Sequence, residues 1–244
     1  MKAGVVVYPG SNCDRDAFHA VRLAGAEAVM LWHETPDLRG CDLAILPGGF
    51  SYGDYLRAGV LARFSPIMAA VRDHAARGGL VLGICNGFQI LAESGLVPGA
   101  LLRNESLRFE HRWVRLSVER RDTPFTRAIP EGRTLRMPVA HGEGNYFLPA
   151  AELGALETNR QVLFRYAPPE GNPNGSQNDI AGIMDSGGRV CGLMPHPERA
   201  SEPVLGSDDG MLLLRSLVES AGESVGESAG AGTSVSAGTS GDTR

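Results

Sequence analysis

The amino-acid sequence predicts an α/β fold, with an open, largely parallel sheet that is flanked by helices and extended by antiparallel strands. In the first half of the chain, short apolar runs alternate with helical patterns, which favours parallel strands joined by crossover helices. The second half is richer in strand-like segments and turn residues. The chain has 244 residues, of which 43% are hydrophobic, so it can bury a core of ordinary size.

The first half contains the segments that predict the parallel part of the sheet. Four short apolar runs predict buried strands: 3–8, 27–32, 43–46 and 80–84. Apolar residues at helical spacing predict a helix over 14–25, and a longer helical pattern covers 58–77. Pro66 should kink or divide that longer segment. The pattern after Gly87 is helical again.

The second half predicts further strands, a loop and a closing helix. Three segments of β-branched and aromatic residues predict strands: 112–119, 134–140 and 161–166. Residues 179–194 predict a hairpin around an Asp-Ser-Gly-Gly turn, and the turn-rich segment 167–179 predicts a loop. An amphipathic helix is expected over 209–220. We therefore expect one domain over 1–220, followed by a disordered tail, 221–244, that is rich in Gly, Ser, Ala and Thr.

The composition excludes several classes of function. A formal net charge of −5 gives no reason to expect nucleic acid or anionic lipid as a partner. No stretch approaches the roughly 20 apolar residues of a membrane span, and no signal peptide is recognisable, so we expect a cytoplasmic protein. Its four cysteines lie far apart and form no CxxC or Cys/His pattern, which predicts neither disulfides nor a metal site. Cys13, Cys41 and Cys191 are most simply structural.

Cys85 is the leading candidate for a nucleophile. It follows the predicted strand 80–84 and lies between two glycines in "GICNG", before a helical pattern. This is the Gly-x-nucleophile-x-Gly form of the elbow that α/β-hydrolases use for serine. A helix amino terminus below the thiol favours the thiolate, and nearby N–H groups can receive an oxyanion. The alternative is a small buried cysteine at a tight turn.

His196 is the leading candidate for the base that such a thiol needs. In "PHPE" it lies between two prolines, which favour an extended backbone. Side chains at i and i+2 of an extended segment point the same way, so Glu198 can reach the imidazole ring and fix its tautomer. The alternative is a rigid Pro-His-Pro loop with a solvated Glu198. A rival pairing of Cys85 with His141 lacks this His-x-Glu geometry.

Together, "GICNGFQ" and "PHPE" resemble the catalytic motifs of the class I glutamine amidotransferases, over about residues 1–220. The resemblance implies a flavodoxin-like fold in which Cys85 attacks the side-chain amide of L-glutamine, with His196 as base and acid and Glu198 as its orienting carboxylate. In "LPGGF", it also implies that the Gly49 N–H forms an oxyanion hole with that of Asn86. Phe50 and Gln89 are expected to shape the glutamine pocket.

Four further stretches resemble one branch of this family: "YPGSNCDRD", "GGFSYGDYLRAG", "HGEGNY" and "NPNGSQNDIAGI". The members of this branch supply ammonia for the ATP-dependent conversion of formylglycinamide ribonucleotide in purine biosynthesis. The resemblance implies a large synthetase subunit and a small bridging subunit as partners. This chain has no GxxxxGK[ST] loop and no compact acidic cluster, so we expect it to bind no cofactor and the synthetase to hold ATP and Mg.

Two loops are candidates for the docking surface on these partners. Glycines isolate His141 and Glu143 in 141–146, which we expect to be a flexible loop outside the core, and 167–179 is the second candidate. Two other functions keep the same fold: a stand-alone hydrolase or peptidase with a cysteine elbow, and a regulatory subunit without catalysis. The presence of Cys85, His196 and Glu198 argues against the regulatory function.

Overall fold

The computed structural model describes residues 1–230, with the backbone alone for residues 222–230. Its strands are β1 (Lys2–Val7), β2 (Glu27–Trp32), β3 (Leu43–Leu46), β4 (Leu80–Ile84), β5 (Ala100–Leu102), β6 (Glu110–Val118), β7 (Leu135–His141), β8 (Asn145–Phe147), β9 (Val162–Ala167), β10 (Ile180–Met184) and β11 (Val190–Leu193). Its α-helices are α1 (Asp14–Leu23), α2 (Ile67–Ala76), α3 (Asn86–Glu93), α4 (Ala150–Thr158) and α5 (Asp209–Gly230). Five short 3₁₀ turns join these elements in the described part of the chain.

Nine of these strands form one sheet in the order β2-β1-β3-β4-β11-β10-β9-β6-β7. The strands from β2 to β11 pair in parallel, and those from β11 to β7 pair antiparallel. The α/β fold is therefore confirmed, with a parallel half in the order of a flavodoxin-like sheet. Every residue of β3 and β4 is buried, as expected of strands covered on both faces.

The antiparallel half confirms the strands expected in the second half of the chain. β10 and β11 form the predicted hairpin, and β7 alternates buried and half-buried residues, as a strand with one face on the core should. The structure adds a small sheet of β5 and β8 and the helix α4, which the sequence did not predict. The two strands have only three residues each. Only Leu156 of α4 is buried, so that helix shows no apolar stripe.

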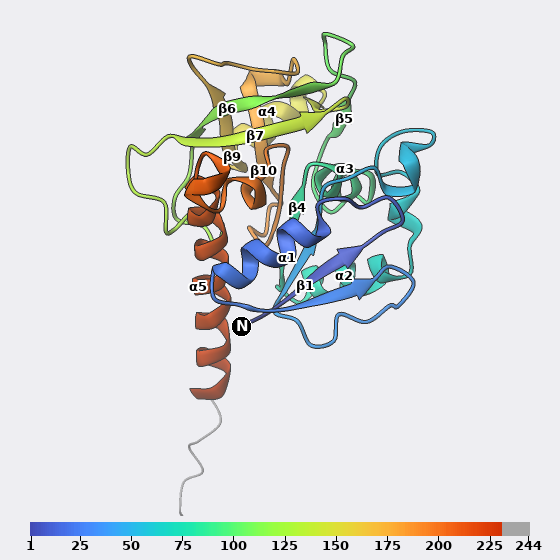
Figure 1. Cartoon of the computed structure of the whole chain (residues 1–244), viewed down its shortest axis with the longest axis vertical. Coiled ribbons are helices and arrows are strands. Elements are labelled where there is room, and N and C mark those ends of the chain that lie inside the picture. The colour runs from blue at the N-terminus through green and yellow to red at the C-terminus, as the bar shows by residue number, and fades with distance from the viewer. Residues whose placement is uncertain (231–244) are drawn as a thin grey trace, which may run out of the picture.

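Helices cover both faces of the parallel half, with α1 and α5 on one face and α2 and α3 on the other (Figure 1). The predicted segment 58–77 divides at Pro66, as expected, into a 3₁₀ turn and α2. α5 continues to Gly230, ten residues beyond the predicted end at 220, because a helix that is already nucleated gains a hydrogen bond with each added residue. The rest of the predicted tail, 231–244, lies outside the described residues. Among the described residues, no helix is both long and apolar enough to cross a membrane.

The topology gathers four segments at one edge of the sheet. β1, β3, β4 and β11 run in the same direction, so their carboxyl ends meet. The residues that follow these ends include Cys13, Gly49, Cys85 and His196. This is the edge at which open α/β sheets place their ligands.

Candidate active site

Cys85 occupies a strained turn between β4 and α3. Its backbone has φ 50° and ψ −104°, in a region that residues with a side chain rarely adopt. The Cys85 N–H donates to the Leu193 carbonyl at 2.8 Å, which ties the turn to β11. A side chain at Gly87 would clash with the Leu46 carbonyl oxygen, and one at Gly83 would clash with Leu91. The two glycines therefore allow the sharp turn that the sequence predicts.

The elbow places the Cys85 thiol above the first turn of α3. The residue is almost fully buried, and its Sγ donates to the Ala140 carbonyl oxygen at 3.6 Å. The free N–H groups of the helix terminus carry partial positive charge and favour a thiolate nearby. The thiol is thus buried at the amino terminus of α3.

His196 and Glu198 form a buried pair on the segment that follows β11. His196 is extended, with φ −105° and ψ 92°, as its flanking prolines predict. Its Nδ1 lies 2.6 Å from Glu198 Oε1, and both side chains are at most 2% exposed. Burial disfavours the imidazolium, but the Glu198 carboxylate and the Cys85 thiolate raise the pKa of His196 well above its usual value. His196 Nε2 has no hydrogen-bond partner within the described residues, which leaves it free to exchange a proton.

Cys85 lies in the wall of a cavity of about 130 Å³. Gly49, Phe50 and Gln89 line it, together with Phe109 from the segment before β6. The rings of Phe50 and Phe109 stack with 6.3 Å between their centroids, and both are about half exposed. The two rings therefore form one side of the cavity and are partly exposed to solvent.

The side chains of Asn86 and Gln89 hold the loops around this cavity. Asn86 Oδ1 accepts from the Ser51 N–H at 3.1 Å, and Asn86 Nδ2 donates to Gln89 Oε1 at 2.8 Å. Gln89 Nε2 then donates to the Glu143 carbonyl oxygen at 2.6 Å. Both side chains are consequently occupied by contacts within the protein. The backbone N–H groups of Gly49 and Asn86 have no recorded partner among the described residues.

Two acidic residues line the cavity, Asp54 and Glu143, and neither was expected from the sequence to belong to the glutamine pocket. Burial, together with the negative charge of Glu143, raises the pKa of Asp54 to about 6. Glu143 Oε2 accepts from the Ala58 N–H at 3.1 Å. The lining of the cavity thus includes two acidic side chains.

The segment 141–146 differs from the expected flexible loop. His141 is 3% exposed and Tyr146 is fully buried, because a network of buried side chains fixes the segment. Asn104 Oδ1 contacts His141 Nδ1 at 3.1 Å and accepts from the Gly144 N–H, while Asn174 Nδ2 lies 3.4 Å from His141 Nε2. Burial lowers the pKa of His141 to about 3. Since both ring nitrogens have partners and the ring is neutral, the geometry favours His196 over His141 as the base.

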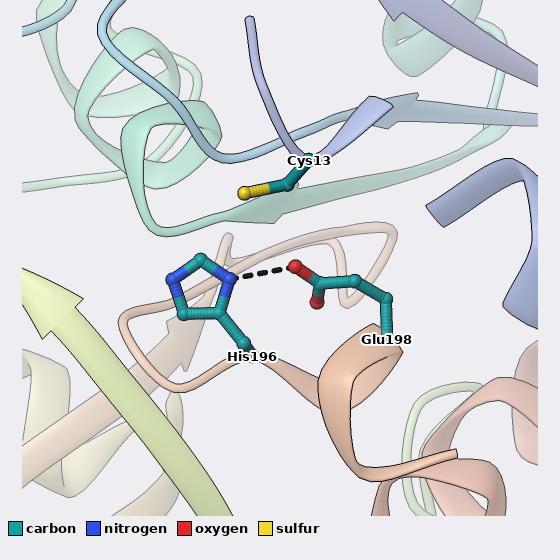
Figure 2. Close-up of side chains that lie close together, drawn as sticks. All are labelled: Cys13, His196 and Glu198. Atoms are coloured by element: carbon teal, nitrogen blue, oxygen red, sulfur yellow. Dashed lines mark hydrogen bonds and ion pairs between the residues drawn. The ribbon is translucent and has the colours of Figure 1, made fainter. Parts of the chain in front are cut away.

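Cys13 lies close to two of the residues predicted to be catalytic. It was interpreted as structural, yet it is buried at the start of α1 beside His196 and Glu198, as Figure 2 shows. One ligand-type atom of each of these three residues lies within 4.8 Å of the other two. Spacing along the chain did not reveal this cluster, because Cys13 and His196 meet only through the order of the strands β1 and β11. Its one signal in the sequence was the motif "YPGSNCDRD" directly after the first strand.

Comparisons with known proteins give one consistent result. Residues 1–208 match the family model of the CobB/CobQ-like glutamine amidotransferase domain. The chain is 59% identical over 221 residues to the phosphoribosylformylglycinamidine synthase subunit PurQ of Rubrobacter xylanophilus, covering 91% of this chain and 99% of that relative. PurQ of Gloeobacter violaceus is 56% identical over 228 residues, covering 91% and 98%. A chain in the structure of PurLQS from Thermotoga maritima superposes with a TM-score of 0.82 at 46% identity, covering 90% and 98%.

Proposed function

The chain belongs to the CobB/CobQ-like glutamine amidotransferase family, and we propose that it is the glutaminase subunit of phosphoribosylformylglycinamidine synthase. It hydrolyses L-glutamine and supplies the ammonia that converts formylglycinamide ribonucleotide to formylglycinamidine ribonucleotide. The relatives named above, which match nearly along their full length, support this assignment. The observation that carries it in the structure is Cys85 on its strained elbow, at the cavity and beside the buried His196–Glu198 pair.

In the first half of the reaction, Cys85 Sγ attacks the carbonyl carbon of the glutamine side-chain amide. His196 Nε2 receives the thiol proton, and the Glu198 carboxylate stabilises the resulting imidazolium through Nδ1. The free N–H groups of Gly49 and Asn86 bind the oxyanion. The intermediate then collapses as His196 returns the proton to the departing nitrogen, which leaves ammonia and a glutamyl thioester on Cys85.

In the second half, a water molecule enters the position that ammonia has vacated. His196 Nε2 takes a proton from this water as it attacks the thioester carbonyl, and the same two N–H groups hold the second oxyanion. The C–S bond breaks, the Cys85 sulfur regains its proton, and glutamate leaves. Water is consumed and ammonia is produced once in each cycle.

Charge and shape in the cavity fit the rest of the glutamine molecule. Its side-chain amide points to Cys85, so its α-ammonium group lies toward the carboxylates of Asp54 and Glu143. Phe50 and Phe109 cover the aliphatic part of the substrate. We assign Gln89 to shaping this pocket through its bonds to Asn86 and Glu143.

The partner subunits carry out the reaction of ammonia with formylglycinamide ribonucleotide. ATP and Mg bind on the large synthetase subunit, the small subunit bridges the assembly, and this chain holds no cofactor. Purine biosynthesis places the complex in the cytoplasm, where the cysteines of this chain stay reduced. Ammonia passes between the active sites inside the complex, because free ammonia would be protonated and lost to solvent.

We propose that an exposed apolar rim beside the cavity is the docking surface. Two of its residues, Phe50 and Phe109, line the cavity, and the other three lie within two residues of a lining residue along the chain. We define it as Phe50, Tyr55, Leu56, Leu107 and Phe109, all of them large apolar residues that are 45% to 89% exposed. Such clusters on a protein surface mark interfaces. The loops 141–146 and 167–179 are weaker candidates, because His141, Tyr146, Asn174 and Ser176 in them are buried.

The test is ammonia transfer in the reconstituted complex. With Cys85→Ala in this chain, glutamine-dependent synthesis of the amidine should fall to background, while synthesis with added ammonium chloride should continue at the wild-type rate. Unchanged glutamine-dependent synthesis would favour a regulatory subunit. Rapid glutamine hydrolysis by the isolated chain, with no gain from the partners, would favour a stand-alone hydrolase.

A further inference from the structure

Cys13 is a buried thiol that the proposed reaction does not use. It precedes α1 and is 2% exposed, and its sulfur lies beside the imidazole of His196 (Figure 2). Gly48 lies directly against both groups: a side chain at Gly48 would come within 2.8 Å of His196 Cε1 and 3.1 Å of Cys13 Sγ. The absence of a side chain at Gly48 therefore lets the thiol and the ring lie against the same stretch of backbone.

A second observation concerns Glu198, whose hydrogen bonds are incomplete. Its Oε1 contacts His196 Nδ1, but its buried Oε2 has no partner among the described residues. A buried carboxylate oxygen without a partner is costly, because nothing replaces its hydration. The Cys13 sulfur donates to Asn12 Oδ1 at 3.1 Å and also lies within interaction distance of the His196 ring. A cation between these groups would satisfy the free oxygen and the sulfur together.

The chemistry of the three ligands selects the kind of cation. Thiolate, imidazole and carboxylate are the ligands of Zn²⁺ and of similar thiophilic ions, whereas Mg²⁺ and Ca²⁺ prefer oxygen alone. Zn–S and Zn–N bonds of about 2.3 and 2.0 Å place two tetrahedral ligand atoms about 3.5 Å apart. The three ligand atoms already lie within 4.8 Å of one another, so small side-chain movements suffice.

We propose that Cys13, His196 and Glu198 form a site for a thiophilic divalent cation, represented by Zn²⁺, and that its occupation switches the glutaminase off. Binding releases the Cys13 thiol proton and the proton between His196 Nδ1 and Glu198 to solvent. A neutral imidazole that binds metal through Nδ1 carries its single proton on Nε2. Nε2 then cannot accept the proton of Cys85, so nucleophilic attack stops. Metal binding itself does not depend on the proposed function; only the inhibition does.

The binding test uses Co²⁺ as a spectroscopic stand-in for Zn²⁺, on the full-length chain with Cys85→Ala. This background removes the rival site that Cys85 and His196 Nε2 could form. We expect a near-ultraviolet sulfur-to-cobalt charge-transfer band that Zn²⁺ displaces. The band should vanish when Cys13→Ser is added and persist when Cys41→Ser is added, since Cys41 is also buried but lies outside the cluster. No band in the Cys85→Ala chain, or a band that survives Cys13→Ser, would overturn the proposal.

Two further measurements distinguish loss of the metal site from a folding defect of the Cys13→Ser variant. Zn²⁺ should raise the melting temperature of the Cys85→Ala chain and leave that of the Cys85→Ala, Cys13→Ser chain unchanged, because only a folded site binds the ion. In the reconstituted complex, Cys13→Ser should raise the Zn²⁺ concentration for half-inhibition of glutamine-dependent synthesis at least about tenfold. Ammonium-dependent synthesis measured at the same Zn²⁺ concentrations reports any effect on the synthetase. If Zn²⁺ binds through Cys13 without inhibiting glutaminase activity that depends on Cys85, the switch is refuted and the site remains.

Discussion

At the scale of single residues, the proposed reaction depends on the proton that Cys85 and His196 exchange. The thiol lies at the amino terminus of α3, and the imidazole lies between Cys85 and the Glu198 carboxylate. Burial disfavours the imidazolium, but the Glu198 carboxylate and the Cys85 thiolate raise the pKa of His196 well above its usual value. The protonation of His196 is therefore set by its two neighbours together.

Glu198→Gln tests this dependence with a side chain of the same shape. The amide cannot stabilise the imidazolium by its charge, and it can hold the ring in the wrong tautomer. We expect kcat for glutamine-dependent synthesis to fall by about 10² to 10⁴-fold, with KM for glutamine within a few-fold. Steady-state kinetics of the complex measures both. A loss confined to KM would contradict the role of Glu198 as a positioning residue.

Asp54 gives a prediction about pH. Its pKa is raised to about 6 by burial and by Glu143, so its carboxyl becomes protonated as the pH falls through that value. The carboxylate is the form that attracts the α-ammonium group of glutamine. KM for glutamine should therefore rise as the pH falls below about 6, and in Asp54→Asn it should be high and nearly constant between pH 5 and 7. An Asp54→Asn enzyme with the wild-type pH profile would remove Asp54 from substrate binding.

At the scale of secondary-structure elements, the site depends on close contact between β3, β4 and α3. Gly87 lies in the first turn of α3, directly against the carbonyl oxygen of Leu46 at the end of β3. That contact lets α3 start next to the sheet, so the elbow can turn within one residue. The reactive thiol is placed by this packing as well as by its own backbone angles.

Gly87→Ala should disrupt this packing, because the added methyl group meets backbone that cannot move aside. We expect a loss of about 1 to 3 kcal/mol in the free energy of unfolding, together with loss of glutaminase activity. Gly154→Ala is the matched control: Gly154 is exposed in α4 and its added methyl group meets nothing within 4 Å. That variant should be stabilised by up to about 1 kcal/mol. Denaturant unfolding measures the free energy of unfolding of both variants. Equal values for Gly87→Ala and Gly154→Ala would refute the packing argument.

The elements that could be predicted from the sequence were those with a strong local pattern. β3 and β4 are continuous apolar runs, and Cys85 and the His196–Glu198 pair lie in short motifs whose geometry is local. β5, β8 and α4 lack such patterns, since two are very short and the third is mostly exposed. Cys13, Asp54 and Glu143 reach the site from segments far apart in the chain. Their positions depend on strand order and loop anchoring, which no single stretch of sequence encodes.

At the scale of the whole molecule, the two halves of the sheet contribute different parts of the candidate site. Its parallel half presents Cys85, Gly49 and His196 at one edge, and its antiparallel half supplies the segment 140–143, which lines the cavity. The apolar rim lies where these two halves meet the solvent. A partner that covers the rim can therefore also close the active site.

Leu56→Asp tests the rim as the docking surface. Leu56 is 89% exposed, so the substitution should leave the stability of the isolated chain within about 0.5 kcal/mol, yet place a charge in an apolar interface. We expect the affinity for the synthetase subunits to fall at least about tenfold. Val204→Asp, which changes an equally exposed apolar residue outside the rim, should bind normally. Calorimetric titration compares the two, and unchanged binding of Leu56→Asp would place the interface elsewhere.

The central claim, that Cys85 is the nucleophile of a glutamine pocket, is tested most directly by labelling with the glutamine-analogue electrophile diazo-oxo-norleucine, followed by peptide mass mapping. The chain should be labelled once, at Cys85, in the presence of the synthetase subunits and their substrates. Glutamine should protect it, and Cys85→Ala should remain unlabelled. If Cys85 stayed unlabelled under these conditions, or if the label appeared on another cysteine of the wild-type chain, the assignment of this site would be wrong.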